Sequence, residues 1–205
     1  AIEVEADWAK RSEVPDDVFK MLKSMPKETH PMTLFSQAVL SLQNGSVFAS
    51  KYHSMKKDVY WEAALEDSLN LTAKLPLIAA YIYRMKYFGE SKKPKFNAKQ
   101  DYGMNFARMM KVSDKKGYAE LARLYFILHS DHESGNASAH AMHLAGSTLS
   151  DAFYSFSASL NALAGPLHGL ANQECLGWLI DVKTKFGGVP SREELYKFSW
   201  VTLNR

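Results

Sequence analysis

The segment NALAGPLHGLANQE, residues 161–174, places one titratable side chain, His168, among glycine, alanine, proline and leucine. Proline is favoured in the first turn of a helix, so Gly165-Pro166 predicts that one helix ends and the next begins there. His168 would then lie in the first turn of a helix, where the helix dipole and apolar burial both disfavour the imidazolium. A neutral imidazole can donate a hydrogen bond to a carbonyl oxygen on which negative charge develops. A hydrogen-bonded core histidine explains the same pattern, and composition alone favours it.

A second polar cluster, HSDHESGNASAHAMH at residues 129–143, contains several histidines. His140 and His143 are three residues apart and would share a helical face, which is compatible with a metal site. No HExxH motif and no cysteine supports that site, so hydrogen-bonded histidines explain the spacing better. His132 lies in DHESGN, which has a turn composition, and could bind an anion as imidazolium or a carbonyl as a neutral donor. Stabilising the turn is the alternative role. A serine nucleophile is not supported, because NASAH lacks a G-x-S-x-G elbow and a preceding strand.

Composition excludes several other classes of protein. The chain has 205 residues, of which 46% are hydrophobic and 23% charged, and a net charge of +3, as is typical of a globular protein with a buried core. The densest basic run, Lys92-Lys93-Pro94-Lys95, lacks interleaved aromatic residues, so it predicts a solvated loop and no nucleic-acid site. The single cysteine, Cys175, cannot form an intramolecular disulfide. No apolar run is long enough to cross a bilayer, and AIEVEADWAKR has no targeting pattern.

Helical periodicity predicts an all-α fold that positions these side chains. Residues 31–42 and 118–128 each carry an apolar stripe at helical spacing, and Asn44-Gly45 provides a stop after the first. Residues 58–88 form a long helical pattern that Pro76 should kink or divide. The Ala- and Ser-rich residues 137–163 predict two tightly packed, buried helices. Ser191 and Glu194 form a capping box that opens a last helix.

The same residues resemble the citrate synthase family, in its eukaryotic mitochondrial branch. The match is most specific in HSDHESGNASAHAMHLAGSTLSDAFYSFSASLNALAGPLHGLANQE. It continues in HPMTLFSQAV, YWEAALEDSLNLTAKLPLIAAYIYR and ARLYFILHSDHE, and so covers most of the chain. The resemblance implies a citrate-synthase-like multi-helical fold. Residues 1–170 would belong to the large helical domain and residues 171–205 to the beginning of a small helical domain, truncated here.

By this resemblance the protein would condense acetyl-CoA with oxaloacetate to give citrate and CoA, as an acyltransferase of the tricarboxylic acid cycle that needs no cofactor or metal. His168 matches the family's histidine that polarises the acetyl thioester carbonyl while an aspartate removes a methyl proton. His132 matches a histidine that helps to bind oxaloacetate. Asn136 and Ser138 match polar positions that could orient the ring of His168. Lys57, shortly before YWE, aligns with a basic position that contacts the CoA phosphates from the neighbouring subunit.

The resemblance also implies partners and a location. The family forms homodimers through antiparallel helices, for which residues 137–163 are the candidates. The partners would be acetyl-CoA, oxaloacetate and a second subunit, with no nucleic acid and no membrane, and the location would be the mitochondrial matrix.

One departure from the family pattern lies inside the match, and others lie beyond it. Ser134 stands where the family has the second glycine of HEGGN, which removes no functional group. The family's catalytic aspartate, its keto-polarising histidine and its carboxylate-binding arginines have no counterpart in the chain. We therefore expect the 205 residues to be the central portion of a longer enzyme, to lack turnover alone and to expose apolar surface. The alternative is a non-catalytic relative that serves as a structural subunit, but the intact motifs around His168 and His132 favour an enzyme.

Overall fold

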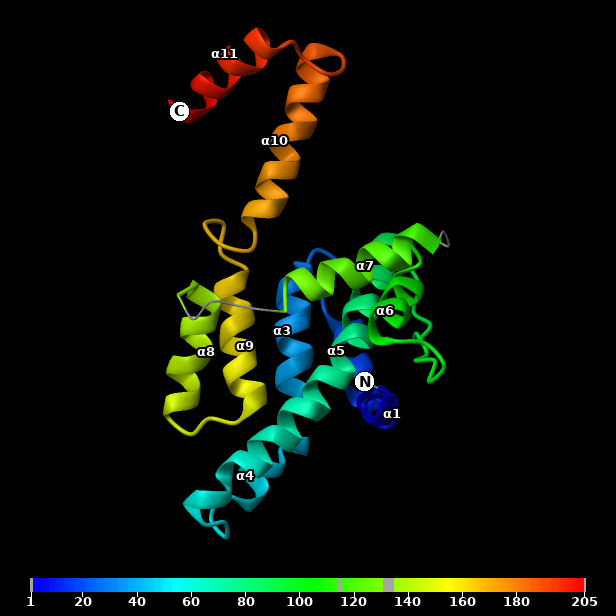
Figure 1. Cartoon of the computed structure of the whole chain (residues 1–205), viewed down its shortest axis with the longest axis vertical. Helices are drawn as coiled ribbons and strands as arrows, with labels where there is room; N and C mark the ends of the chain where they lie inside the picture. Colours follow the sequence, from blue (N-terminus) through cyan, green and yellow to red (C-terminus); the bar gives the residue numbers. More distant parts are fainter. Residues whose placement is uncertain (1, 114–115, 131–134, 205) are drawn as a thin grey trace. The chain divides into compact units, whose positions relative to one another are not determined.

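The computed structural model describes residues 2–113, 116–130 and 135–204, and every regular element in these ranges is helical (Figure 1), which confirms the predicted all-α class. The elements are α1 (Ile2–Arg11), α2 (Asp16–Ser24), α3 (Pro31–Ser41), the 3₁₀ helix η1 (Gln43–Gly45), α4 (Val47–Lys51), the 3₁₀ helix η2 (Lys57–Val59), α5 (Tyr60–Phe88), α6 (Tyr102–Met110), α7 (Lys116–Leu128), α8 (Ala137–Ser147), α9 (Ala152–Leu163), α10 (Ala171–Phe186) and α11 (Arg192–Leu203). Within the described ranges, no helix combines the length and the apolar composition that a membrane span requires.

The chain divides into two compact units, Ala1–Ala162 and Leu163–Arg205. The first unit contains α1 to α8 and nearly all of α9, and the second contains α10 and α11. The boundary between a large and a small domain after residue 170, which the family resemblance implies, remains a prediction.

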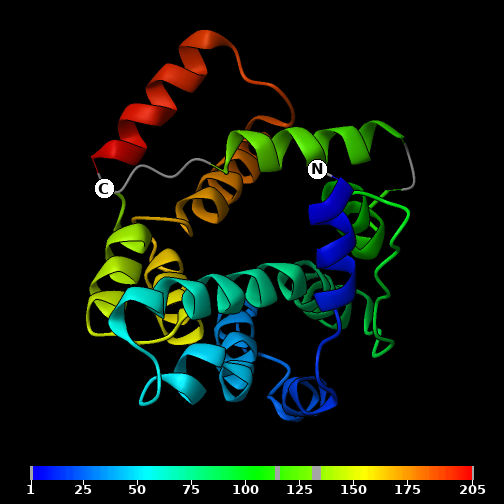
Figure 2. The same ribbon diagram turned by 60° about the horizontal axis from the view of Figure 1, so that its bottom comes forward.

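The long helix α5 provides the centre of the first unit. Its buried face includes Leu71, Leu77, Ile78 and Tyr81. Helices α1, α3, α4 and α6 pack against it, and Figures 1 and 2 show α3 beside it. Phe19 of α2 meets the ring of Tyr81 edge-on, with 4.8 Å between ring centroids. Helices that precede and follow α5 in the chain thus share one apolar core around it.

Pro76 lies inside α5, and the helix continues through it to Phe88. Of the two predicted outcomes, division of the helix at Pro76 is therefore wrong, and a kink stays a prediction. A proline has no N–H to donate to the carbonyl four residues earlier, which here belongs to Thr72. The hydroxyl of Tyr102, on α6, donates to this carbonyl at 3.0 Å. The Tyr102 side chain is half-buried, and this burial raises the pKa of its phenol. A tertiary hydrogen bond therefore replaces the helical one that the proline removes.

A buried carboxylate on α5 caps the short helix α4. Asp67 accepts hydrogen bonds from the Ser46 hydroxyl at 2.6 Å, the Val47 N–H at 2.6 Å and the Phe48 N–H at 3.1 Å. The first N–H groups of a helix have no partner within the helix, and a negative charge there also complements the helix dipole. Asp67 thereby fixes the start of α4 to the central helix.

Residues 137–163 form a pair of helices, as the sequence predicts: α8 and α9 lie side by side (Figures 1 and 2). Gly146 of α8 faces Ser155 of α9, and a Cβ at position 146 would lie 3.7 Å from the Ser155 hydroxyl oxygen, an ordinary van der Waals contact.

Only α9 of this pair is substantially buried. It buries Phe153 and Leu160, and its Ser157 hydroxyl is hydrogen-bonded to that of Ser36 on α3 at 2.7 Å. Helix α8 buries only Ser138 among its residues, and its Leu144 is exposed. The prediction that both helices are buried is therefore wrong for α8, because α9 alone lies against α3.

The second unit is held by contacts between α10 and α11. The indole N–H of Trp178 donates to the Thr202 hydroxyl at 3.1 Å, and the Trp178 ring lies 5.9 Å from that of Phe198. The predicted capping box is confirmed: the Ser191 hydroxyl accepts from the Glu194 N–H at 3.3 Å, and the Glu194 carboxylate accepts from the Ser191 N–H at 2.8 Å. This box fixes the start of α11.

Candidate active site

His168 lies in a series of turns between α9 and α10. Helix α10 begins at Ala171, so the prediction that His168 occupies its first turn is wrong. The His168 N–H donates to the Gly165 carbonyl at 3.0 Å, and the His168 carbonyl accepts from the Ala171 N–H at 3.1 Å. The Leu170 N–H also reaches the Gly165 carbonyl, at 3.3 Å. A bond that spans five residues is incompatible with the four-residue repeat of an α-helix, so the helix starts only after this turn.

Close packing requires a glycine at position 169, next to His168. A Cβ at this position would lie 2.5 Å from the Leu163 carbonyl oxygen, at the end of α9. Only glycine permits such an approach without displacement of the backbone. The backbone next to His168 is therefore held against the end of α9. His168 itself is partly exposed.

Asn136 and Ser138 come together at the start of α8. The Asn136 side-chain oxygen accepts hydrogen bonds from the Ala139 N–H at 2.9 Å and from the Ser138 hydroxyl at 2.8 Å. Asn136 is thus the N-cap of α8, a role for which asparagine is among the preferred residues. Both residues thus have a structural role at this cap, and their support of His168, which belongs to the other unit, remains a prediction.

Lys57 opens the 3₁₀ helix η2, directly before α5, and is exposed. An exposed ammonium group can bind phosphate as a compact point charge. His132 lies outside the described residues. Of the predicted site residues, the structure therefore brings Asn136 and Ser138 into contact and places Lys57 on another element of the same unit.

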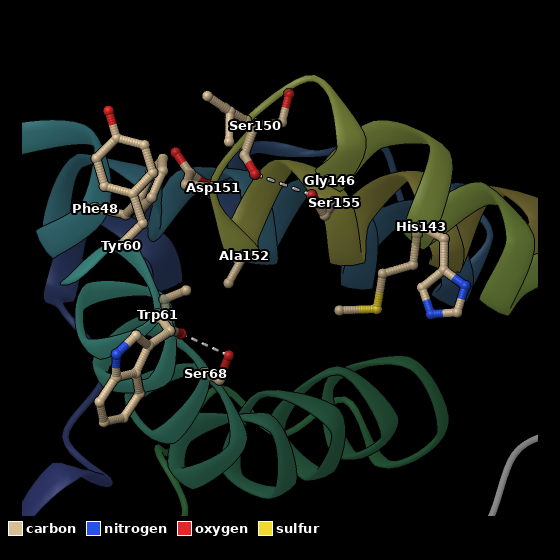
Figure 3. A pocket seen from close by; sticks show the side chains of 13 residues that line it. Phe48, Tyr60, Trp61, Ser68, His143, Gly146, Ser150, Asp151, Ala152 and Ser155 are labelled. Atoms are coloured by element: carbon tan, nitrogen blue, oxygen red, sulfur yellow. Dashed lines mark hydrogen bonds between the residues drawn. The ribbon is translucent and has the colours of Figure 1, made fainter. Parts of the chain in front are cut away.

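A pocket of about 480 Å³, formed by residues of α4, α5, α8, the loop after α8 and α9, is a feature that the sequence analysis missed (Figure 3). Aromatic side chains of Tyr60 and Trp61 line it, together with His143 and Asp151. Figure 3 shows His143 and Asp151 at opposite ends of the pocket, so they form no catalytic pair. No sequence motif marks this pocket, because it depends on packing between residues far apart in the chain.

The carboxylate of Asp151 is engaged in fixing the start of α9. It accepts hydrogen bonds from the Phe153 N–H at 2.9 Å, the Tyr154 N–H at 3.1 Å and the Gln43 amide at 2.8 Å. The pocket therefore offers an aromatic surface rather than a set of reactive groups.

The candidate metal ligands do not converge in the part of the chain that the structure describes. His140 and His143 are both exposed on α8. Among the described residues, no three histidine, cysteine, aspartate or glutamate side chains come close enough to hold a metal ion. Asp131 and His132 lie outside those residues. The described part of the cluster thus gives no support to a metal site.

Comparisons with known proteins agree on one family. The family model for the citrate synthase C-terminal domain matches residues 1–204. The chain is 46% identical over 202 residues to a probable mitochondrial citrate synthase of Glossina morsitans morsitans, covering 98% of this chain and 43% of that protein. It is 47% identical over 200 residues to the mitochondrial citrate synthase of Saccharomyces cerevisiae, covering 97% of this chain and 41% of that protein.

A solved structure gives the same result at the level of the fold. The citrate synthase of Pyrobaculum aerophilum superposes with a TM-score of 0.71 at 30% identity, covering 84% of this chain and 43% of that one. The chain thus spans less than half the length of the relatives that it matches.

Proposed function

The chain belongs to the citrate synthase family, and on this basis we propose that the protein condenses acetyl-CoA with oxaloacetate to give citrate and CoA. The observation that carries the proposal is 46–47% identity to mitochondrial citrate synthases over nearly the whole chain. The motifs GPLHG and HSDHE, which hold His168 and His132, are both intact. Because the chain spans less than half of these relatives, the proposal concerns the activity of the full-length protein.

The role that we assign to His168 is polarisation of the thioester carbonyl of acetyl-CoA. Loss of a methyl proton to a carboxylate leaves negative charge on the thioester oxygen, and a hydrogen-bond donor at that oxygen lowers the barrier. The turn around His168 supports this role, because the Gly165 bonds and the close contact of Gly169 fix its backbone before substrate binds. The resulting enol carbon attacks the keto carbon of oxaloacetate, and water then hydrolyses the citryl thioester to citrate and CoA.

The other predicted residues take supporting roles in the same proposal. His132 binds oxaloacetate, and Lys57 contacts the CoA phosphates of the neighbouring subunit. Asn136 and Ser138, which meet at the start of α8, take the role of orienting the ring of His168 in this proposal. No cofactor takes part, since acetyl-CoA enters as a substrate.

The proposal extends to the domains, the assembly and the location of the protein. Residues 1–170 belong to the large domain and residues 171–205 to the start of the small one. The protein forms a homodimer through residues 137–163, in support of which Leu144, Leu149 and Tyr154 of this segment are exposed. The similarity to mitochondrial citrate synthases supports the mitochondrial matrix as the location.

The decisive test is thiol release from acetyl-CoA in the presence of oxaloacetate, measured on the full-length protein. Loss of one preorganised hydrogen-bond donor commonly costs about 10²–10³-fold in kcat, so we expect a loss of that size for His168→Asn. His140→Gln is the matched control, because His140 is exposed on α8 and has no role in the proposed reaction. An intact full-length protein that releases no thiol would refute the proposal and favour the structural-subunit alternative.

A further inference from the structure

We propose that Leu163, the last residue of α9, is a positioning residue whose side chain holds the turn that carries His168. This inference rests on the proposed function, because it concerns the group that polarises the thioester. Leu163 lies five positions before His168 and outside the GPLHG motif. Both residues belong to the compact unit Leu163–Arg205, so the contact between their segments lies within one unit.

The half-buried side chain of Leu163 fills the space beside Gly169. A Cβ at position 169 would lie 2.5 Å from the Leu163 Cδ1 and 2.7 Å from its Cγ. Two carbon atoms attract each other at about 3.5–4.0 Å, so these positions exclude each other. The isobutyl group therefore lies against the side of Gly169 on which any other residue would carry its side chain.

The hydrogen bonds of the turn do not replace this contact. The N–H groups of His168 and Leu170 both donate to the Gly165 carbonyl, so these bonds connect residues of the turn with one another. The side chain of Leu167, directly before His168, is fully exposed and does not pack the turn against any described residue. The Leu163 side chain, in contrast, connects the turn to the end of α9.

The proposed chemistry of His168 depends on the position of its ring. A hydrogen-bond donor polarises the thioester carbonyl only when it points at the oxygen on which charge develops, and a misplacement of about 1 Å can cost about 10²-fold in rate. Truncation of Leu163 would leave space beside Gly169 into which the turn can move. The His168 ring would then be less well aligned before the substrate binds, and the loss would appear in the chemical step.

The test is the steady-state kinetics of thiol release by the full-length protein. Leu163→Ala keeps the backbone carbonyl that also contacts position 169 and removes only the side-chain contact. We expect kcat to fall about tenfold while the KM for oxaloacetate changes by less than about twofold, since the proposal gives His168 no contact with oxaloacetate. Leu163→Met restores a side chain of similar volume and should return kcat to within about twofold of the wild type.

A double-mutant cycle with His168→Asn separates positioning from a general loss of folded protein. If Leu163 acts through His168, Leu163→Ala should change kcat by less than about twofold in the His168→Asn background. A variant that is merely less folded would lose the same factor in both backgrounds. Where circular dichroism shows that Leu163→Ala does not fold, Leu163→Val provides the same comparison with an expected loss of roughly threefold.

Leu195→Ala is the matched control, because Leu195 is a partly exposed leucine on α11 of the same unit. It should change kcat by less than about twofold, since it is distant in the chain from the turn of His168. An active wild type whose kcat is unchanged by Leu163→Ala would overturn the inference, and so would equal losses in the two backgrounds or a matching loss in Leu195→Ala. A wild type that releases no thiol would instead overturn the proposed function on which the inference rests.

Discussion

Because Pro76 has no N–H, the Thr72 carbonyl in α5 lacks its usual helical donor. The hydroxyl of Tyr102 donates to this carbonyl instead. Without this hydroxyl the partly buried Thr72 carbonyl would lose its donor. An unsatisfied buried carbonyl costs about 1–3 kcal/mol. We therefore expect Tyr102→Phe to lower the free energy of unfolding by about 1–2 kcal/mol in urea titrations, although the ring contacts with Trp8 and Phe126 are kept.

A double-mutant cycle separates this bond from other effects of the substitution. In a Pro76→Ala background, residue 76 regains an N–H that can donate to Thr72, so the cost of Tyr102→Phe should fall by roughly 1 kcal/mol. Tyr154→Phe, at an exposed position on α9, is the control and should have little effect. Equal costs of Tyr102→Phe in both backgrounds would show that the Tyr102 hydroxyl does not compensate for the proline.

The ion pair between Asp101 and Arg123 predicts that the stability of the folded protein depends on pH. The Arg123 guanidinium binds its carboxylate at 3.0 Å and 2.6 Å and lowers the pKa of Asp101 below its usual value of 3.8. A carboxyl whose pKa is lower in the folded state adds stability above the usual value, and this stability is lost as the pH falls through the folded pKa. Asp101→Asn should therefore be less stable than the wild type at pH 7, and the difference should disappear well below pH 4.

The Asp101→Asn substitution removes the charge of residue 101 but keeps the cap of α6, because the asparagine side chain can still accept the hydrogen bond from the Met104 N–H. The expected difference at pH 7 is at most about 1 kcal/mol, since the ion pair is partly exposed. Urea midpoints between pH 7 and pH 3 provide the measurement, with Glu28→Gln, an exposed loop position, as the control. A difference between the two proteins that stays constant over this range would contradict the assignment.

At the level of the elements, Asn136 gives a direct test of what starts α8. Loss of an N-cap side chain typically costs about 1 kcal/mol, so Asn136→Ala should lower the free energy of unfolding by that amount. Asn136→Asp keeps an oxygen acceptor for the Ala139 N–H and should retain most of the stability. Urea unfolding of the two variants checks the cap, and equal losses for both would show that the cap is not the stabilising contact.

The same pair of variants distinguishes the cap from the proposed catalytic support. If the side chain acts only by starting the helix, Asn136→Asp should keep both stability and turnover. If its amide N–H groups also orient the active site, turnover should fall in Asn136→Asp while stability is kept, because aspartate lacks those donors.

Local sequence signals predicted most of the helices correctly. The 3.6-residue repeat identified α3, α5 and α7, and the Ser191–Glu194 pair identified the start of α11. The departures from these predictions arose where contacts from outside a helix override its local preference. Pro76 stays within a helix because Tyr102, 26 positions later in the chain, satisfies the freed carbonyl. His168 stays outside a helix because close packing of Gly169 against Leu163 supports a turn.

Less of the candidate site than of the helices could be predicted from the sequence. Residue types and spacing left His168 open to both a catalytic and a core role, and only the resemblance to a family favoured catalysis. The sequence also did not show that Asn136 and Ser138 meet at a helix start, although an asparagine before an alanine-rich segment is a recognisable capping signal. The pocket beside Trp61 depends on packing between helices, which no short motif encodes.

At the scale of the whole molecule, many large apolar side chains of the 205-residue chain are exposed. The apolar stripe of α7 predicted from the sequence, Leu121, Leu124, Tyr125 and Leu128, lies at the surface. Helix α10 adds exposed Leu176, Leu179 and Ile180. Soluble monomers rarely expose contiguous apolar surface of this kind, which marks surfaces that bind other protein segments.

We therefore expect the isolated 205-residue chain to self-associate and to bind the dye ANS. Light scattering coupled to size-exclusion chromatography should give a mass that rises with concentration above the 23.1 kDa of one chain. Replacement of Leu121 and Leu128 by glutamine should reduce both dye binding and association while the helical circular dichroism is kept, because the two side chains are exposed. The matched replacement of exposed Ser130 and Ser147 by glutamine should change neither. A 205-residue chain that stays monomeric and binds no dye would show that its apolar side chains are covered within the chain itself, contrary to the exposure described for α7 and α10.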